Sequence, residues 1–332
     1  MWRAGSNSGE CWQAPRDLGN FLDAQVRVSK LTAPFSHSSL HANRYRAFWN
    51  QTEESCTQYN VLKVARRSFL TSAEASKADF YERAILNGIL GNQNKEDPIG
   101  ATSYIYMQPL GGVNTKPWGK SDYGFPCCWG TLSESFAKLG DSIFFWRPAA
   151  TASTSSTPAA LLINQFVSAT ATLRHLPGVA VKMVAGFPVD PVTTATLTVQ
   201  GSGTFDILVR VPEWAKSSTN LVTVNGVAVA GAPYVPQSYL RVASHSWKDG
   251  DRIEISFPMS LWTAPLNDYH PEHNSTLAFM YGPLVLAGVN VSSDIWVPKG
   301  GPEAAKTNPA AFIHRSSNDS LTFEGAGADG SS

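Results

Sequence analysis

The chain has 332 residues, 43% of them hydrophobic and 16% charged, and its 26 basic residues balance 26 acidic ones. This is the composition of a globular protein long enough for two domains. The zero net charge gives no reason to expect nucleic acid or an anionic membrane as a partner. No apolar run reaches the length of a membrane span, and the first residues lack a signal-peptide pattern, so the compartment stays open.

Two helices are predicted in the first half of the chain from the spacing of apolar residues. The first spans about Cys56 to Leu70. Ser55 followed by Gln58 matches the capping box that opens many helices. The second helix is the run "AEASKADFYERAILNGIL".

A third helix is predicted just after a pair of adjacent cysteines, in "TLSESFAKLG". Thr131 and Glu134 have the spacing of a second capping box, and Gly140 stands where a left-handed terminating residue is expected. This prediction places Cys127 and Cys128 just ahead of the helix.

The hydrophobic period changes to two after residues 147–160, a Pro/Ala/Ser/Thr-rich segment that we interpret as a linker or surface loop. Between 161 and 290, short alternating runs are separated by turn signals, of which Asn225-Gly226 is the strongest. Short strands without intervening helices indicate a β-sandwich domain. Residues 291–332 form a weakly patterned tail ending in "GAGADGSS", which we expect to be disordered.

Residues 24–51 show neither period and separate two strongly patterned regions. We interpret this segment as an insertion, most simply a long surface loop.

Four side chains near the first and third helices could bind one metal ion. Helix N-termini favour thiolates because their unpaired N–H groups carry partial positive charge, and thiolates bind soft metals. Glu54 lies two residues before Cys56, so one turn could offer a carboxylate and a sulfur. Cys127 and Cys128 would complete a tetrahedral zinc set. Spacing alone leaves a second interpretation open, in which the cysteines are buried, unreactive packing residues.

Five stretches of the chain together carry a family resemblance. They are "GSNSGECW", "EESCTQYNVLKVARRSF", "FYERAILNG", "CCWGTLSESFAKLGDSIFF" and "FMYGPLVLAG". These motifs resemble glycoside hydrolase family 127, the β-L-arabinofuranosidases, through most of residues 1–146 and on to about residue 289. The resemblance implies an α+β multidomain protein, in which the C-terminal part of an (α/α)6 barrel, residues 1–146, precedes the β-sandwich of 161–290.

The resemblance also implies the site. A zinc ion would be held by Glu54, Cys56, Cys127 and Cys128, and the substrate would be a glycan or glycopeptide carrying terminal β-L-arabinofuranose. Cys127 would attack the anomeric carbon, with Glu10 as the general acid/base of a retaining hydrolysis. Without the resemblance, Glu10 is interpreted as an exposed surface carboxylate.

Other residues near these motifs have less defined roles. Cys11 has no partner in the motifs and is interpreted as a packing residue. Four aromatic residues could stack on a sugar or pack in the core: Trp12, Trp118, Tyr123 and Trp129.

The chain departs from the family in two ways. Few residues precede Glu10, whereas the family's barrel begins far upstream, so we expect a truncated chain that lacks most barrel helices. Residues 24–51 separate Asp23 from Thr52, which the family would place almost next to each other. Two interpretations stay open for them: a real insertion that loops out, or translated intron. Two other functions stay open: a non-catalytic, zinc-stapled remnant that binds sugar or nothing, and a thiol redox or regulatory metal protein.

Overall fold

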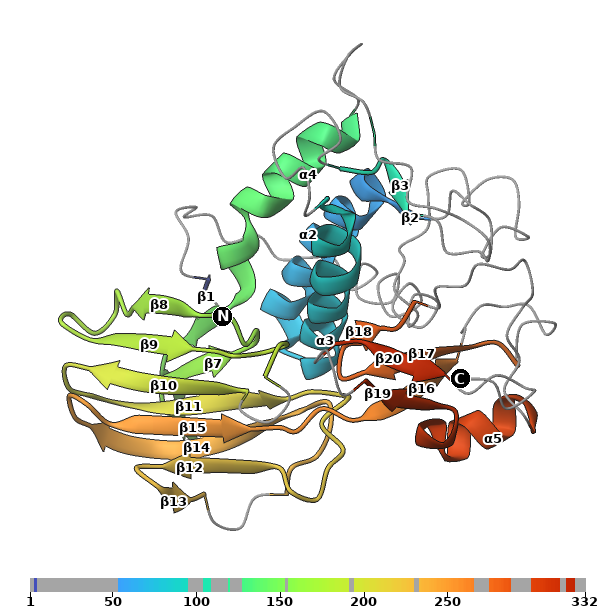
Figure 1. Ribbon diagram of the computed structural model, residues 1–332. Helices are drawn as coiled ribbons and strands as arrows, with labels where there is room; N and C mark the ends of the chain where they lie inside the picture. The colour runs from blue at the N-terminus through green and yellow to red at the C-terminus, as the bar shows by residue number, and fades with distance from the viewer. Residues whose placement is uncertain are drawn as a thin grey trace. The chain divides into compact units, whose positions relative to one another are not determined.

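The computed structural model describes residues 3–4, 53–94, 104–108, 119, 127–152, 155–190, 194–229, 233–265, 275–287, 300–316 and 321–325. The expected insertion at 24–51 lies outside these residues, as does the end of the tail after residue 325. The described fold mixes a few helices with several β-sheets (Figure 1). It divides into two compact units, with one boundary after Ala65 and another after Asp79.

The three predicted helices are present, with shifted ends. Helix α2 spans Ser55–Ser72 and confirms the first prediction. Helix α3 spans Ala75–Ala84 and continues through a π-helical turn, η2 (Ile85–Ile89), and a 3-10 turn, η3 (Leu90–Asn92). Helix α4 spans Cys127–Ala137, so it begins at the cysteine pair and not after it. Among the described residues, none of the helices is both long and apolar enough to cross a membrane.

The first predicted capping box is wrong. Ser55 is already the first residue of α2, and its Oγ donates to the carbonyl oxygens of Ile105 and Tyr106, each at 3.3 Å. Gln58 is fully buried, and its amide atoms have no hydrogen-bond partner among the described residues. The serine hydroxyl therefore makes a tertiary contact in place of a local cap.

The second capping box is wrong for the same physical reason. Thr131 lies inside α4, and the carboxylate of Glu134 accepts a hydrogen bond from the Tyr59 hydroxyl. Gly140 does not terminate α4 in the left-handed region; it lies in the 3-10 turn η4 (Leu139–Ser142), and its φ is not positive.

The first unit comprises Met1–Pro15, Arg66–Asp79 and Leu139–Ser260 and contains two large sheets. One has the strand order β1-β4-β7-β11-β14, and the other β13-β12-β15-β10-β9-β8. Neighbouring strands are antiparallel except β7 and β11, which are parallel. The strands are β1 (Arg3–Ala4), β4 (Phe144–Arg147), β7 (Ala160–Ile163), β8 (Ala169–Thr172), β9 (Ala180–Val184), β10 (Ala195–Gln200), β11 (Gly203–Val211), β12 (Leu221–Val224), β13 (Val227–Ala228), β14 (Ser238–Trp247) and β15 (Arg252–Ser256).

Buried aromatic rings that follow one strand of each sheet connect the two sheets of this unit. The ring of Phe166, just after β7, contacts that of Phe257, just after β15, at a centroid distance of 6.1 Å. Strand β11 is buried on both faces from 205 to 211. Its outer face is covered by the second half of α2, because Phe69 packs in one cluster with Leu208. The Asn225-Gly226 turn joins β12 to β13 with both residues at positive φ, which confirms the predicted hairpin.

Two segments predicted to be irregular contain regular structure. Within 147–160, β5 (Ala150–Ala152) and β6 (Ser155–Thr157) pair as an antiparallel hairpin, for which the β-branched threonines are suited. The tail contains α5 (Gly301–Thr307), η6 (Pro309–Ala311), β19 (Ile313–Arg315) and β20 (Phe323–Gly325). A proline in the first turn of α5 supplies the fixed φ that helix starts favour.

The second unit comprises Arg16–Ala65, Phe80–Lys138 and Leu261–Ser332. Strand β2 (Glu53–Glu54) pairs with β3 (Met107–Gln108), and a second sheet joins β16 (Leu261–Pro265), β17 (Leu277–Tyr281) and β18 (Leu284–Val285). Residues of α2, α3, η2 and α4 form one hydrophobic cluster: Leu62, Ala65, Phe80, Tyr81, Ala84, Ile89, Trp129 and Leu132. This cluster packs the middle of α2 against α4.

Candidate metal centre

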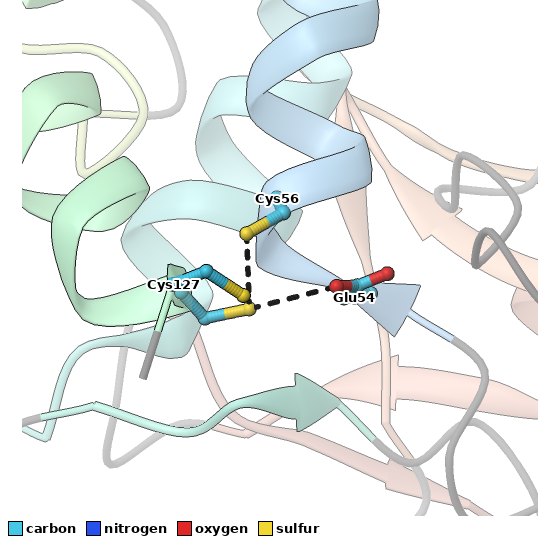
Figure 2. Close-up of side chains that lie close together, drawn as sticks. Glu54, Cys56 and Cys127 are labelled. Atoms are coloured by element: carbon cyan, nitrogen blue, oxygen red, sulfur yellow. Dashed lines mark hydrogen bonds between the residues drawn. The ribbon is translucent and has the colours of Figure 1, made fainter. Parts of the chain in front are cut away.

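Four potential ligands meet where α2 and α4 begin, within the second unit. Glu54 is the last residue of β2, Cys56 is the second residue of α2, and Cys127 and Cys128 open α4. One ligand atom of each lies within 4.8 Å of the other three. Figure 2 shows Glu54, Cys56 and Cys127 pointing toward one another. Two turns that are far apart in sequence thus form one cluster of donors.

The donor set and its spacing fit a zinc ion. The Cys128 Sγ lies 3.4 Å from the Cys56 Sγ and 3.9 Å from the Glu54 Oε1. Tetrahedral zinc with Zn–S bonds of about 2.3 Å holds its sulfurs about 3.8 Å apart, close to these separations. Cysteine sulfur and carboxylate oxygen are both donors that zinc accepts, so three cysteines and one glutamate could hold it.

The Glu54–Cys56 turn is anchored by the residue between the two ligands. Ser55 is fully buried, and its backbone N–H donates to the Tyr106 carbonyl at 3.3 Å. The buried Asn92 amide donates to the Ser55 Oγ at 2.9 Å. The Thr57 hydroxyl donates to the Glu54 Oε2 at 3.1 Å and so orients the carboxylate. These contacts fix the positions of the carboxylate and of the residue that carries the first sulfur.

The adjacent cysteines have different environments because neighbouring side chains on a helix point about 100° apart. Cys128 is fully buried, whereas Cys127 is exposed. Burial raises the pKa of the Cys128 thiol, because a thiolate loses hydration there. The hydrogen bond between the Tyr106 hydroxyl and the Cys127 Sγ, at 3.2 Å, is the main cause that lowers the pKa of Cys127. The exposed sulfur is therefore also the one whose ionised form is favoured.

Cys56 lies between these two extremes. Partial burial is the main cause that raises the pKa of its thiol, and a hydrogen bond with Thr131 acts in the opposite direction. The Thr131 Oγ1 lies 3.3 Å from the Cys56 Sγ, across 75 residues of sequence.

Sequence reasoning missed two residues of this site. Tyr106 stands 21 residues before Cys127 and carries no motif, so only the pairing of β2 with β3 reveals that it is near. Thr131 was expected to cap a helix and instead contacts Cys56. Trp129 is buried in the core and rests against Tyr104 at a centroid distance of 5.7 Å, so it packs and does not form a sugar platform.

Several predicted site residues lie outside the described part of the chain. They are the acid/base candidate Glu10, Cys11, and the aromatic residues Trp12, Trp118 and Tyr123.

Comparison with protein families gives two matches that together span more than half of the chain. Residues 32–141 match the β-L-arabinofuranosidase GH127 catalytic domain, and residues 160–259 match the GH127 middle domain. The first match begins inside the segment 24–51 and ends after the cysteine pair. Among curated proteins, no significant match is found.

Solved structures resemble this chain in fold. A glycoside hydrolase matches with a TM-score of 0.56 at 21% identity, over 71% of this chain and 38% of its own. A GH127 β-arabinofuranosidase matches with a TM-score of 0.57 at 21% identity, over 74% and 38%. A GH127 β-L-arabinofuranosidase from Geobacillus stearothermophilus T6, Ara127N-Se, matches with 0.54 at 24%, over 70% and 36%. The chain thus spans less than half the length of these proteins.

Proposed function

The chain belongs to the GH127 β-L-arabinofuranosidase family, and on that premise we propose that it is a retaining glycoside hydrolase releasing terminal β-L-arabinofuranose from a glycan or glycopeptide. The observation that carries this proposal is the cluster of Glu54, Cys56, Cys127 and Cys128, in which one sulfur alone is exposed. An exposed sulfur beside ligands that are half-buried or buried is what a nucleophile held by a metal requires.

We also propose that residues 1–146 are part of an (α/α)6 barrel and that 161–290 form a β-sandwich. The catalytic-domain and middle-domain matches, at 32–141 and 160–259, support this division. The segment 24–51 stays a proposed insertion, and sequencing the transcript across codons 20–55 tests it. A continuous message encoding Val26 to Trp49 would refute the intron hypothesis.

In the proposed first step, the Cys127 Sγ attacks the anomeric carbon of the sugar. A C–S bond forms while the glycosidic C–O bond breaks, and Glu10 gives its proton to the departing oxygen. The hydrogen bond from Tyr106 and the position at the first residue of α4 both favour the thiolate needed for this attack. Cys127 can meet a substrate because it is exposed.

In the second step, water replaces the sulfur at the same carbon. Glu10, now a carboxylate, takes a proton from the water, the C–S bond breaks and the Cys127 thiolate returns. Two inversions give net retention at the anomeric carbon. Zinc, when bound, supplies a positive charge that keeps coordinated thiols deprotonated at neutral pH. Glu54, Cys56 and Cys128 would hold it beside Cys127.

The test combines metal content with activity and a trapped adduct. We expect one zinc per chain and hydrolysis of an aryl β-L-arabinofuranoside, both measured on the full chain. Cys127→Ser should abolish hydrolysis, and Glu10→Gln should slow it; Cys11→Ser is the matched cysteine control. A glycosyl adduct on the Cys127 peptide, found by mass spectrometry after rapid quenching, would identify the nucleophile.

The second candidate function is a non-catalytic remnant that keeps the metal. The observation that favours it is the four-ligand donor set, because structural zinc sites are commonly tetrahedral with four protein ligands. Stoichiometric zinc without any hydrolysis would support this candidate over the enzyme. A chain with neither zinc nor hydrolysis would contradict both.

A further inference from the structure

We propose that Thr131 is a positioning residue of the metal centre, whose hydroxyl holds the Cys56 sulfur in the ligand set. This inference rests on the proposed function, because it concerns the same metal centre. Thr131 lies on α4, one turn after the cysteine pair. Cys56 lies on α2. The hydroxyl therefore links the two helices at the point where their ligands meet.

One oxygen atom contacts all three cysteines of the site. The Thr131 Oγ1 lies 3.3 Å from the Cys56 Sγ, 3.4 Å from the Cys127 carbonyl oxygen and 3.3 Å from the Cys128 carbonyl oxygen. The two carbonyl contacts are the i−4 and i−3 contacts that a helical threonine can always make. The contact to the sulfur is tertiary, since 75 residues separate the two side chains.

A hydroxyl has one proton to donate and two lone pairs that accept, so it suits both states of Cys56. When Cys56 is a thiol, its S–H donates to the Thr131 Oγ1, and the hydroxyl proton points to a backbone carbonyl. When Cys56 is a thiolate ligand, it has no proton to give, and the hydroxyl must donate to the sulfur. This change needs only rotation about the Cβ–Oγ1 bond, because all three acceptors already lie within 3.4 Å.

The hydrogen bond is made to the sulfur of Cys56, which in the proposed mechanism is a metal ligand and not the nucleophile. It shares the negative charge of the Cys56 thiolate and fixes the sulfur's direction, as outer-shell partners of metal ligands commonly do. Cys127 has a different hydroxyl partner, Tyr106. Each of these two sulfurs therefore has its own hydroxyl partner. Thr131, within α4, contacts Cys56, and Tyr106, just before β3, contacts Cys127.

The test measures zinc affinity by competition with a chromophoric chelator, using the full chain. Thr131→Val keeps the branched shape and removes the hydroxyl, and we expect it to weaken zinc binding about 10- to 100-fold. Thr131→Ser keeps the hydroxyl and should stay within about threefold of the wild type, well short of that loss. Thr71→Val is the matched control, because among the described residues the Thr71 hydroxyl contacts a backbone carbonyl, that of Arg67, in the same helix-internal manner and no sulfur.

A second variant without the hydroxyl tests whether a loss of affinity in Thr131→Val comes from misfolding. Thr131→Ala places a strong helix former in α4, so it should fold, and we expect the same affinity loss as in the valine variant. In the cobalt-substituted protein, the thiolate-to-metal charge-transfer bands should shift in both deletions and return in the serine variant. The metal-free proteins should unfold at the same temperature.

The outcomes separate this inference from the proposed function. If the wild type binds zinc and the Thr131→Val and Thr131→Ala variants bind it with the wild-type affinity, the proposed role of Thr131 is overturned while the metal centre stands. A fall in the melting temperature of the metal-free deletions that the serine variant does not restore assigns Thr131 to helix packing and also overturns it. If the wild type binds no zinc, the metal centre and the role of Thr131 fail together.

Discussion

The sulfur of Cys56 lies 3.4 Å from the sulfur of Cys128, although 72 residues separate them in sequence. Two uncharged thiols gain little free energy from lying this close, whereas two sulfurs that bind one metal ion must lie close together. The distance is set by the hydrophobic cluster that packs α2 against α4, to which Leu62 and Leu132 contribute from the two helices. The core of the second unit thus brings the two sulfurs together.

The first prediction concerns the ligands. Glu54→Gln, Cys56→Ser and Cys128→Ser should each weaken zinc binding by more than about 100-fold, because losing a direct ligand should exceed the loss of an outer-shell partner. Chelator competition measures this, and Cys11→Ser is the control that should leave zinc binding unchanged. Near-normal affinity in the Cys128→Ser protein would contradict the four-ligand site.

The second prediction concerns pH. The Tyr106 hydrogen bond lowers the pKa of Cys127, so in the metal-free protein the thiolate persists to lower pH than in an ordinary cysteine. Tyr106→Phe removes that bond, and the midpoint of Cys127 alkylation by iodoacetamide should move to higher pH. Peptide fragmentation locates the adduct on Cys127 and not on Cys128.

The control for this pH experiment is Tyr104→Phe. Tyr104 stacks with Phe136 at a centroid distance of 5.8 Å and packs against the hydrophobic cluster. Its variant should alkylate with the wild-type midpoint. A Tyr106→Phe midpoint that stays in place or moves downward would show that the hydrogen bond does not stabilise the thiolate.

The third prediction concerns a buried ion pair in the first unit. The fully buried Arg210 guanidinium binds the Asp79 carboxylate and also donates to the Asn164 carbonyl oxygen at 2.6 Å. Asp79→Ala removes the carboxylate that the buried guanidinium binds, so the free energy of unfolding should fall by about 3–5 kcal/mol. Glu254→Ala, which breaks an exposed pair with Arg252, should cost less than about 1 kcal/mol. Denaturant titration measures both, and equal costs would contradict the structural role of the buried pair.

The fourth prediction concerns close packing at Gly119. A Cβ at this position would stand 2.5 Å from the Trp129 ring, which is buried and cannot swing into solvent. Gly119→Ala should therefore lower the free energy of unfolding by about 1–3 kcal/mol. Gly140 is the matched control, because an added Cβ there meets nothing within 4 Å. If the two alanine variants unfold alike, Trp129 is less rigidly held than its burial implies.

The sequence singled out the four potential ligands, because a carboxylate and a cysteine two residues apart and a cysteine doublet are local patterns. Spacing alone left a packing role for the cysteines open, and the family resemblance supplied the ligand assignment. The sequence also located α2 and the Asn225-Gly226 hairpin, for which periodicity and turn chemistry are sufficient. These features depend on neighbours in the chain, which is the information that a sequence displays directly.

The features that sequence missed depend on distant partners. Ser55 has the local form of a cap, yet its hydroxyl meets the carbonyl of Ile105, 50 residues away. The role of Tyr106 follows from strand pairing between β2 and β3, each only two residues long. No periodicity can be read from two residues, so neither the pairing nor the hydroxyl that it brings to Cys127 could be expected.

The doublet at the start of α4 has a geometric consequence. A rotation of about 100° between neighbouring helical residues divides the pair between interior and solvent without any bend in the backbone. Cys127 and Cys128 are therefore the same residue type in two different environments, and the helical rotation between them determines which of the two sulfurs is exposed.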